Sequence, residues 1–127
     1  MAVRKIVIGA LLAACAAPVS ASVIVIGSSD ARLCFEAADS PLMPQIGDLR
    51  RCDGALNVGN LSNYETLATH VNRGILRLRR GQIDDAIADF DAAMVLDPNQ
   101  PEAYLNKGAA LIQRQNPISV TKMNSMR

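Results

Sequence analysis

The feature that most restricts how this chain can fold is an internal repeat with a period of 34 residues. The Asn-x-Gly sequence at positions 72–74 returns at positions 106–108, after a shift of 34. A repeat of this length is one supersecondary unit that cannot bury its apolar side alone and therefore stacks on its neighbours. The aligned pairs outside these triplets are His70 with Tyr104, Val71 with Leu105, Leu78 with Ile112, and Arg80 with Arg114.

Local signals predict that each unit is a pair of helices. Ser62 and Glu65 form a capping box, Gly81 is placed to end that helix, and Asn99 with Glu102 repeats the cap pattern. Aromatic residues are scarce and alanine and leucine are common, which favours closely packed helices over a sheet. The predicted helices cover residues 30–39, 46–57, 62–80, 83–96 and the stretch from the 99–102 cap to about residue 115.

The chain resembles the tetratricopeptide repeat (TPR) family, whose pattern places a glycine after an aromatic, then an alanine and an aromatic, and a closing proline. The resemblance implies an all-α fold, a short solenoid of antiparallel helix pairs. In this chain we expect it to follow an N-terminal signal peptide, which the first residues indicate. It divides the mature chain into an extended arm with a degenerate first helix pair (22–63), a complete unit (64–100), the first helix of a second unit (101–115) and a divergent tail (116–127). The matching residues are Gly74, Ala86, Phe90, Ala93 and Pro98, then Tyr104, Gly108 and Leu111.

Departures from the family pattern occur in both units. His70 and Arg77 stand where aromatic residues are usual, and Arg73 stands where an apolar residue is usual. After residue 114 no alanine-bearing second helix follows, so the reading frame is interpreted as truncated, frame-shifted or divergent at this end. Leu111 and Ile112 would then be poorly covered, and we expect self-association through the open end.

The first 21 residues have the order of a secretory leader. Arg4 and Lys5 precede an uncharged apolar run, and cleavage is expected after Ala21. An uncleaved membrane helix is an alternative, although Pro18 interrupts the run. The stretch at 12–15 also resembles a bacterial lipobox, in which Cys15 would carry a lipid. We expect a periplasmic or secreted bacterial protein, with an envelope lipoprotein as the alternative.

The remaining cysteines, Cys34 and Cys52, form a pair. In an oxidising compartment such a pair in a small domain indicates a disulfide. A redox or metal pair is the alternative, but the Cys-x-x-Cys spacing and a nearby histidine are missing. When the degenerate pair is aligned with the complete unit, Cys52 falls at the position of Phe90. A disulfide from Cys52 would then replace the aromatic packing of that position.

Nothing in the sequence predicts catalysis. His70 is the only histidine, and no nucleophile motif, glycine-rich phosphate loop or metal-ligand spacing is present. We therefore expect no enzyme activity and no cofactor. The formal net charge of +1 gives no indication of nucleic-acid binding.

Five aspartates between positions 84 and 97 raise the alternative of a metal site. They flank an apolar stripe at helical spacing, however, and a calcium loop needs oxygens on a bent segment that contains glycine. Asp84 and Asp85 also lie in the first helical turn, where the helix dipole favours negative charge. The cluster is interpreted as the solvated back of a repeat helix, and the inward stripe is Ile83, Ala86, Ile87, Phe90, Ala93 and Met94.

The resemblance implies a non-catalytic scaffold or adaptor that binds another protein or peptide in a concave groove. The alternative is a lipid-anchored structural component of the envelope, which would contact the membrane only through Cys15. Arg73, Arg77 and Arg80 fall at helical spacing and could hold a partner's carboxylate, or pair with the aspartates opposite. The groove residues implied by the resemblance are Val71, Asn72, Ile75, Leu78, Arg79, Leu105, Asn106 and Ala109.

Overall fold

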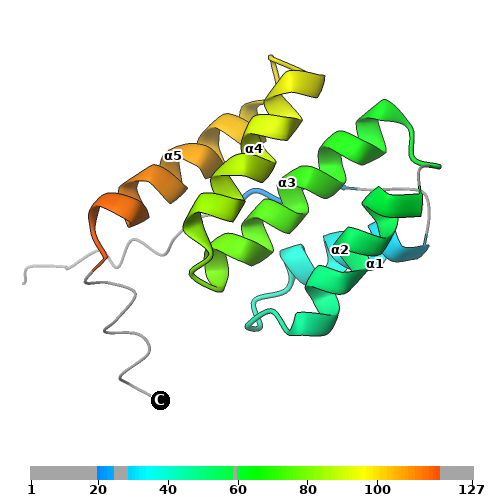
Figure 1. Cartoon of the computed structure of the whole chain (residues 1–127), viewed down its shortest axis with the longest axis horizontal. Coiled ribbons are helices and arrows are strands. Elements are labelled where there is room, and N and C mark those ends of the chain that lie inside the picture. Colours follow the sequence, from blue (N-terminus) through cyan, green and yellow to red (C-terminus); the bar gives the residue numbers. More distant parts are fainter. Residues whose placement is uncertain (1–19, 25–28, 59, 118–127) are drawn as a thin grey trace, which may run out of the picture.

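The fold is a row of antiparallel helices (Figure 1). A computed structural model describes residues 20–24, 29–58 and 60–117. Within these ranges the chain is all-helical, as the repeat predicted, and no strand occurs. The helices are α1 (Ser29–Asp39), α2 (Ile46–Val58), α3 (Asn63–Arg79), α4 (Ile83–Leu96) and α5 (Pro101–Gln115).

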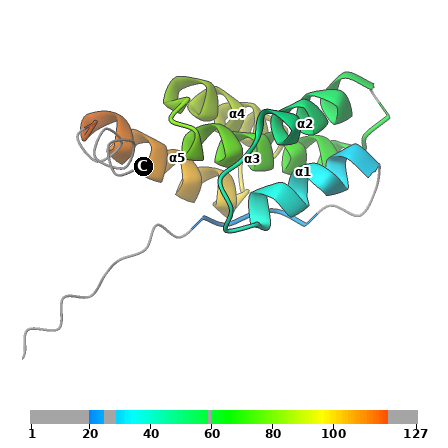
Figure 2. The same cartoon turned by 90° about the horizontal axis from the view of Figure 1, so that it is seen from below.

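The helices form two layers around α3. Figure 2 shows α1, α3 and α5 on one side of the molecule and α2 and α4 on the other. Helix α3 packs against each of the other four helices, so it carries the centre of the core. We call the side formed by the odd-numbered helices the α1–α3–α5 face.

Two of the three predicted helix boundaries are confirmed in detail. The Ser62 hydroxyl accepts a hydrogen bond from the Glu65 N–H, and the Ser62 N–H donates to the Glu65 carboxylate at 2.8 Å, which completes the capping box. Gly81 ends α3 in the left-handed region, with φ of 78°. The predicted cap at Asn99 is wrong.

Helix α5 instead begins at a proline. Its N-cap is Gln100, which makes no side-chain cap, and Pro101 is the first helical residue. Proline suits this position because its fixed φ is already helical and its missing N–H would have had no partner there. The Asn99 N–H donates to Asp97 Oδ1 at 2.9 Å, so these residues form a turn before the helix.

The α3–α4 contact depends on a missing side chain. The Phe90 ring is fully buried against Gly74, and a Cβ at position 74 would lie 2.5 Å from Cε1 of that ring. The small residue therefore lets the two helices approach closely, as the repeat indicated. At Gly108, the equivalent position on α5, no described atom lies within 4 Å of such a Cβ.

The first helix pair is joined covalently. Cys34 of α1 and Cys52 of α2 form a disulfide across a Cα–Cα distance of 5.0 Å, as the pairing predicted. Both side chains are fully buried. Because α1 and α2 each also pack against α3, the disulfide belongs to the same core as the Phe90 contact.

Both ends of the chain reach beyond the described residues. The predicted leader lies almost wholly outside them, including Cys15, and so does most of the divergent tail. Among the residues that are described, no helix is long and apolar enough to cross a membrane. At the C-terminal end of the row, Ile112 is 64% exposed and Leu111 is half-buried. Self-association through this end stays a prediction.

Candidate partner-binding face

A non-helical stretch of the chain's own N-terminal part, residues 20–24, crosses the α1–α3–α5 face. Figure 2 shows it as an extended trace beneath these helices. We call it the N-terminal segment. Its contacts reach all three odd-numbered helices, through Asp39 on α1, Asn72 on α3 and Asn106 on α5. The face therefore has the geometry to hold an extended polypeptide.

Asn72 makes the central contact. Its side-chain Oδ1 accepts a hydrogen bond from the Val23 N–H at 3.0 Å, and its Nδ2 donates to the Val23 carbonyl at 2.8 Å. Asn72 is fully buried, and Val23 is 5% exposed. A buried carboxamide needs hydrogen-bond partners, and here one backbone residue supplies both of them.

Asn106 repeats this contact one unit further along. Its Nδ2 donates to the Ala21 carbonyl at 3.0 Å and to the Glu102 carbonyl at 2.8 Å. Asn106 is the residue that a shift of 34 places on Asn72. Two repeat-equivalent asparagines thus bind backbone carbonyl groups two residues apart on the N-terminal segment.

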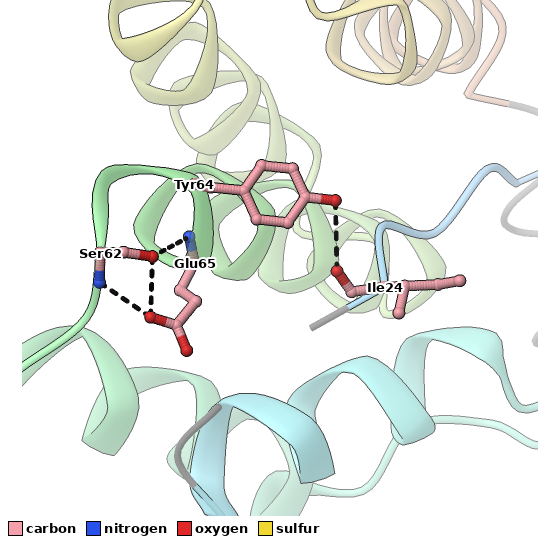
Figure 3. Close-up of a pocket in the computed structure, with 4 residues that line it drawn as sticks. All are labelled: Ile24, Ser62, Tyr64 and Glu65. Atoms are coloured by element: carbon pink, nitrogen blue, oxygen red, sulfur yellow. Dashed lines mark hydrogen bonds between the residues drawn. The ribbon is translucent and has the colours of Figure 1, made fainter. Parts of the chain in front are cut away.

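The far end of the segment lies beside the start of α3. Figure 3 shows a shallow recess lined by Ile24, Ser62, Tyr64 and Glu65. The Tyr64 hydroxyl donates to the Ile24 carbonyl at 3.4 Å. Ser62 and Glu65 bond to each other in the capping box, so the polar groups of this recess stabilise the helix.

On the α4 side of α3, a buried carboxylate binds the three residues that depart from the family pattern. Asp89 is 2% exposed and accepts hydrogen bonds from Arg73 at 2.7 Å, from Arg77 at 2.8 Å and from His70 Nδ1 at 3.0 Å. Arg73 also donates to Asp53 of α2 at 2.7 Å. The interpretation of the aspartate cluster as solvated is therefore wrong for Asp89.

The protonation of this cluster follows from its contacts. Burial alone would raise the pKa of Asp89, but the hydrogen bonds from His70 and Arg73 and the charges of Arg73 and Arg77 outweigh it and lower that pKa. For Arg73 the directions are reversed. Burial alone would lower the pKa of Arg73, but the hydrogen bonds and charges of Asp89 and Asp53 outweigh this effect and raise that pKa. The carboxylate and guanidinium are charged at neutral pH, so these groups form a structural ion network.

The network also decides whether Arg73 and Arg77 bind a partner's carboxylate or pair with aspartates of the chain. Arg73 and Arg77 pair with aspartates of the chain itself, as one of the two alternatives expected, and do not present a fork to a partner. The helical spacing of His70, Arg73 and Arg77 indicated that these side chains share one side of α3. That Asp89 is the carboxylate that accepts their hydrogen bonds was not predicted. Across the described ranges, no group of three or more His, Cys, Asp or Glu side chains is arranged to hold a metal ion.

The comparison with protein families assigns the repeat. Residues 74–114, from the middle of α3 to Arg114 of α5, match the family model described as TPR repeat. This part of the chain is a TPR repeat. TPR repeats are typically non-catalytic modules that bind other proteins or peptides. No curated protein and no solved structure matches the chain significantly.

The TPR match begins within α3 and so leaves out the first helix pair, which is a degenerate form of the pattern. There the bond between Cys34 and Cys52 takes the place of the aromatic contact that Phe90 makes in the complete TPR unit. The pair still packs on α3 and supplies Asp39 to the N-terminal segment. The TPR layer is thus extended by a disulfide-bonded pair.

The predicted TPR groove residues differ in their surroundings. Val71 and Ile75 are buried in the core, while Leu105 is 54% exposed and Ala109 is also exposed. The two asparagines of the set contact the N-terminal segment. Leu78 is half-buried beside the core. As contacts of a partner, all of these positions stay predictions.

Arg79, the last of the predicted groove residues, is engaged elsewhere. Its guanidinium donates to the carbonyls of Ser40, at 2.8 Å, and of Leu42 in the α1–α2 connection. The neighbouring Arg80 donates to the Pro44 carbonyl at 2.7 Å. These contacts tie the end of α3 to the first helix pair.

Proposed function

We propose that the chain is an exported, non-catalytic TPR adaptor that binds another protein through the α1–α3–α5 face. The observation that carries this proposal is the extended segment on that face, held through its backbone by Asn72 and Asn106. Side-chain amides that satisfy backbone groups recognise an extended chain in general, so a segment of another protein could make the same bonds.

Leu105, which the family resemblance places in the groove, is apolar, 54% exposed and next to Asn106 in the sequence. It would gain burial when a partner is bound. For a side chain of this size, full burial contributes about 2 kcal/mol. No described group on this face resembles a catalytic centre, and TPR modules are typically non-catalytic.

Export is supported by the leader-like sequence of residues 1–21 and by the bond between Cys34 and Cys52. Disulfides persist mainly in oxidising compartments. We propose a periplasmic or secreted location, and the lipobox-like stretch before Cys15 motivates anchoring to the envelope as the alternative. Cell fractionation of the wild-type chain and Cys15→Ser separates the two. A soluble periplasmic wild-type protein excludes the anchor, and release from the membrane only in Cys15→Ser establishes it.

Site-specific photo-crosslinking tests the binding function. A photoreactive residue at position 105 is compared with one at position 95 on α4, where the native valine is 82% exposed. In the producing cells we expect a discrete crosslinked protein from position 105 and none from position 95. Equal crosslinking at both positions, or none at either, would refute the proposed face.

A further inference from the structure

The N-terminal segment lies on the α1–α3–α5 face as a bound peptide would. The hydrogen bonds between Val23 and Asn72 join residues 49 positions apart, and the bond from Asn106 reaches Ala21 across 85 positions. No helix or strand of its own supports the segment, since residues 20–24 have no regular secondary structure. Its described polar bonds are made with the α1–α3–α5 face.

The contact selects one kind of side chain. Val23 is 5% exposed and belongs to the apolar core, whereas the next residue, Ile24, is 62% exposed. A charged residue at the position of Val23 would be buried without a partner, which is costly. A β-branched aliphatic residue suits the position because its side chain is stiff and favours extended backbone.

The segment would survive removal of a leader. If cleavage follows Ala21, the bond from Asn106 to the Ala21 carbonyl is lost. The two bonds between Val23 and Asn72, and the bond from Tyr64 to Ile24, lie on the retained side. The Ser22 hydroxyl, which donates to Asp39 at 3.0 Å, is also retained. The mature chain would therefore carry its own ligand.

We propose that residues 22–24 are an internal ligand of the α1–α3–α5 face. A partner binds there by replacing them with an extended segment of its own that has a β-branched aliphatic residue at the place of Val23. This inference rests on the proposed function and deepens it. Asn72 supplies the bonds that are exchanged, because its carboxamide can bind the backbone N–H and C=O of any residue except proline. The place occupied by Val23 supplies the selectivity.

The N-terminal segment competes with any peptide from outside, because it is covalently joined to the protein that it binds. A segment joined to α1 by a short connection acts at an effective concentration in the millimolar range, so a free peptide competes poorly with it. The affinity measured for a partner is reduced by the fraction of molecules whose face is empty. Weakening the internal segment should therefore strengthen binding from outside.

A peptide-binding measurement on the full chain tests the proposal. The probe is a fluorescent peptide with the sequence of residues 20–24, Ser-Ala-Ser-Val-Ile, followed by lysines for solubility. We expect Val23→Asp to bind this peptide roughly tenfold or more tightly than the wild type, because its own segment no longer competes. A peptide in which aspartate replaces the valine should bind neither protein.

The role of Asn72 is tested in the same background. Adding Asn72→Leu to Val23→Asp should weaken peptide binding by roughly tenfold, while adding Asn99→Leu at an exposed turn position should leave it unchanged. Equal affinity of Val23→Asp and the wild type, no binding to either, or binding that survives Asn72→Leu would each overturn the proposal.

A second measurement does not depend on the folding of a variant. In the wild-type chain, NMR titration with excess peptide should move the Val23 amide resonance to its random-coil position while the α4 resonances stay in place. A Val23 resonance that is unchanged at millimolar peptide would overturn the proposal. The experiments distinguish failure of the internal-ligand proposal from failure of the proposed adaptor function. Peptide binding without a crosslinked cellular partner leaves the internal ligand and removes the adaptor function, and the reverse pattern removes the internal ligand alone.

Discussion

Gly74 of α3 lies directly under the ring of Phe90 of α4, and a methyl group at position 74 would stand 2.5 Å from that ring. Phe90 is fully buried, so the ring can move away only against the residues packed around it. The contact joins the two helices of the complete TPR unit.

Gly74→Ala should therefore destabilise the protein. Overpacking in a closely packed core costs about 1–3 kcal/mol, which exceeds the gain of up to about 1 kcal/mol in helix propensity. Urea unfolding measures the difference. The matched control is Gly108→Ala at the equivalent position of the next unit, where no described atom lies within 4 Å and propensity alone should apply. Equal destabilisation by both substitutions would contradict this explanation.

The disulfide between Cys34 and Cys52 should contribute a measurable part of the stability. It closes a loop of 18 residues, for which the chain-entropy model gives about 3 kcal/mol. Thermal unfolding with and without reductant measures this contribution. The midpoint of the wild type should fall on reduction, and that of Cys34→Ala/Cys52→Ala should not respond to the reductant. A wild-type midpoint that does not change on reduction would show that helix packing alone holds the first pair.

Asp89→Asn should be strongly destabilising. It leaves the half-buried guanidinium of Arg77 without a carboxylate and that of Arg73 with Asp53 alone. Breaking a buried pair costs about 3 kcal/mol. The control is Asp91→Asn on the same helix, whose partner is Lys107 and whose side chain is 49% exposed. That pair should contribute less than about 1 kcal/mol. Similar free energies of unfolding for the two variants would contradict a special role for Asp89.

The same carboxylate predicts how stability depends on pH. The pKa of Asp89 is lower in the folded state than its ordinary value of 3.8. Its contribution is therefore fully present above that value and is lost as the pH falls below it, towards the folded pKa. Acid unfolding followed by circular dichroism should show this loss below about pH 4 in the wild type and a smaller one in Asp89→Asn. Identical acid transitions would assign the loss to other carboxyl groups.

Much of the fold could be predicted because its signals are local. The capping box at Ser62, the glycine stop at Gly81 and the close approach at Gly74 each depend on neighbours within one repeat. The disulfide could also be predicted, because the repeat register places Cys52 on the inward side of its helix. The cap predicted at Asn99 failed because Pro101 offers a competing start two residues later.

Contacts between distant segments were not predictable from one sequence. Asp89 is the same residue type as its exposed neighbours Asp84 and Asp85. Its burial depends on three hydrogen-bonding side chains of another helix, those of His70, Arg73 and Arg77. The placement of the N-terminal segment depends on bonds across 49 and 85 positions. The recurrence of Asn72 at Asn106 marked the recognising residues, but not what they recognise.

Amide hydrogen exchange at Val23 tests the central claim most directly. The Val23 N–H donates to the buried Asn72 side chain, so in the wild type it should exchange at least about tenfold more slowly than in an unfolded chain. In Asn72→Leu this protection should disappear while the α3 and α4 amides stay protected. Exchange of Val23 at the unfolded rate in the wild type, with α3 protected, would contradict the claim that the α1–α3–α5 face holds the chain's own segment.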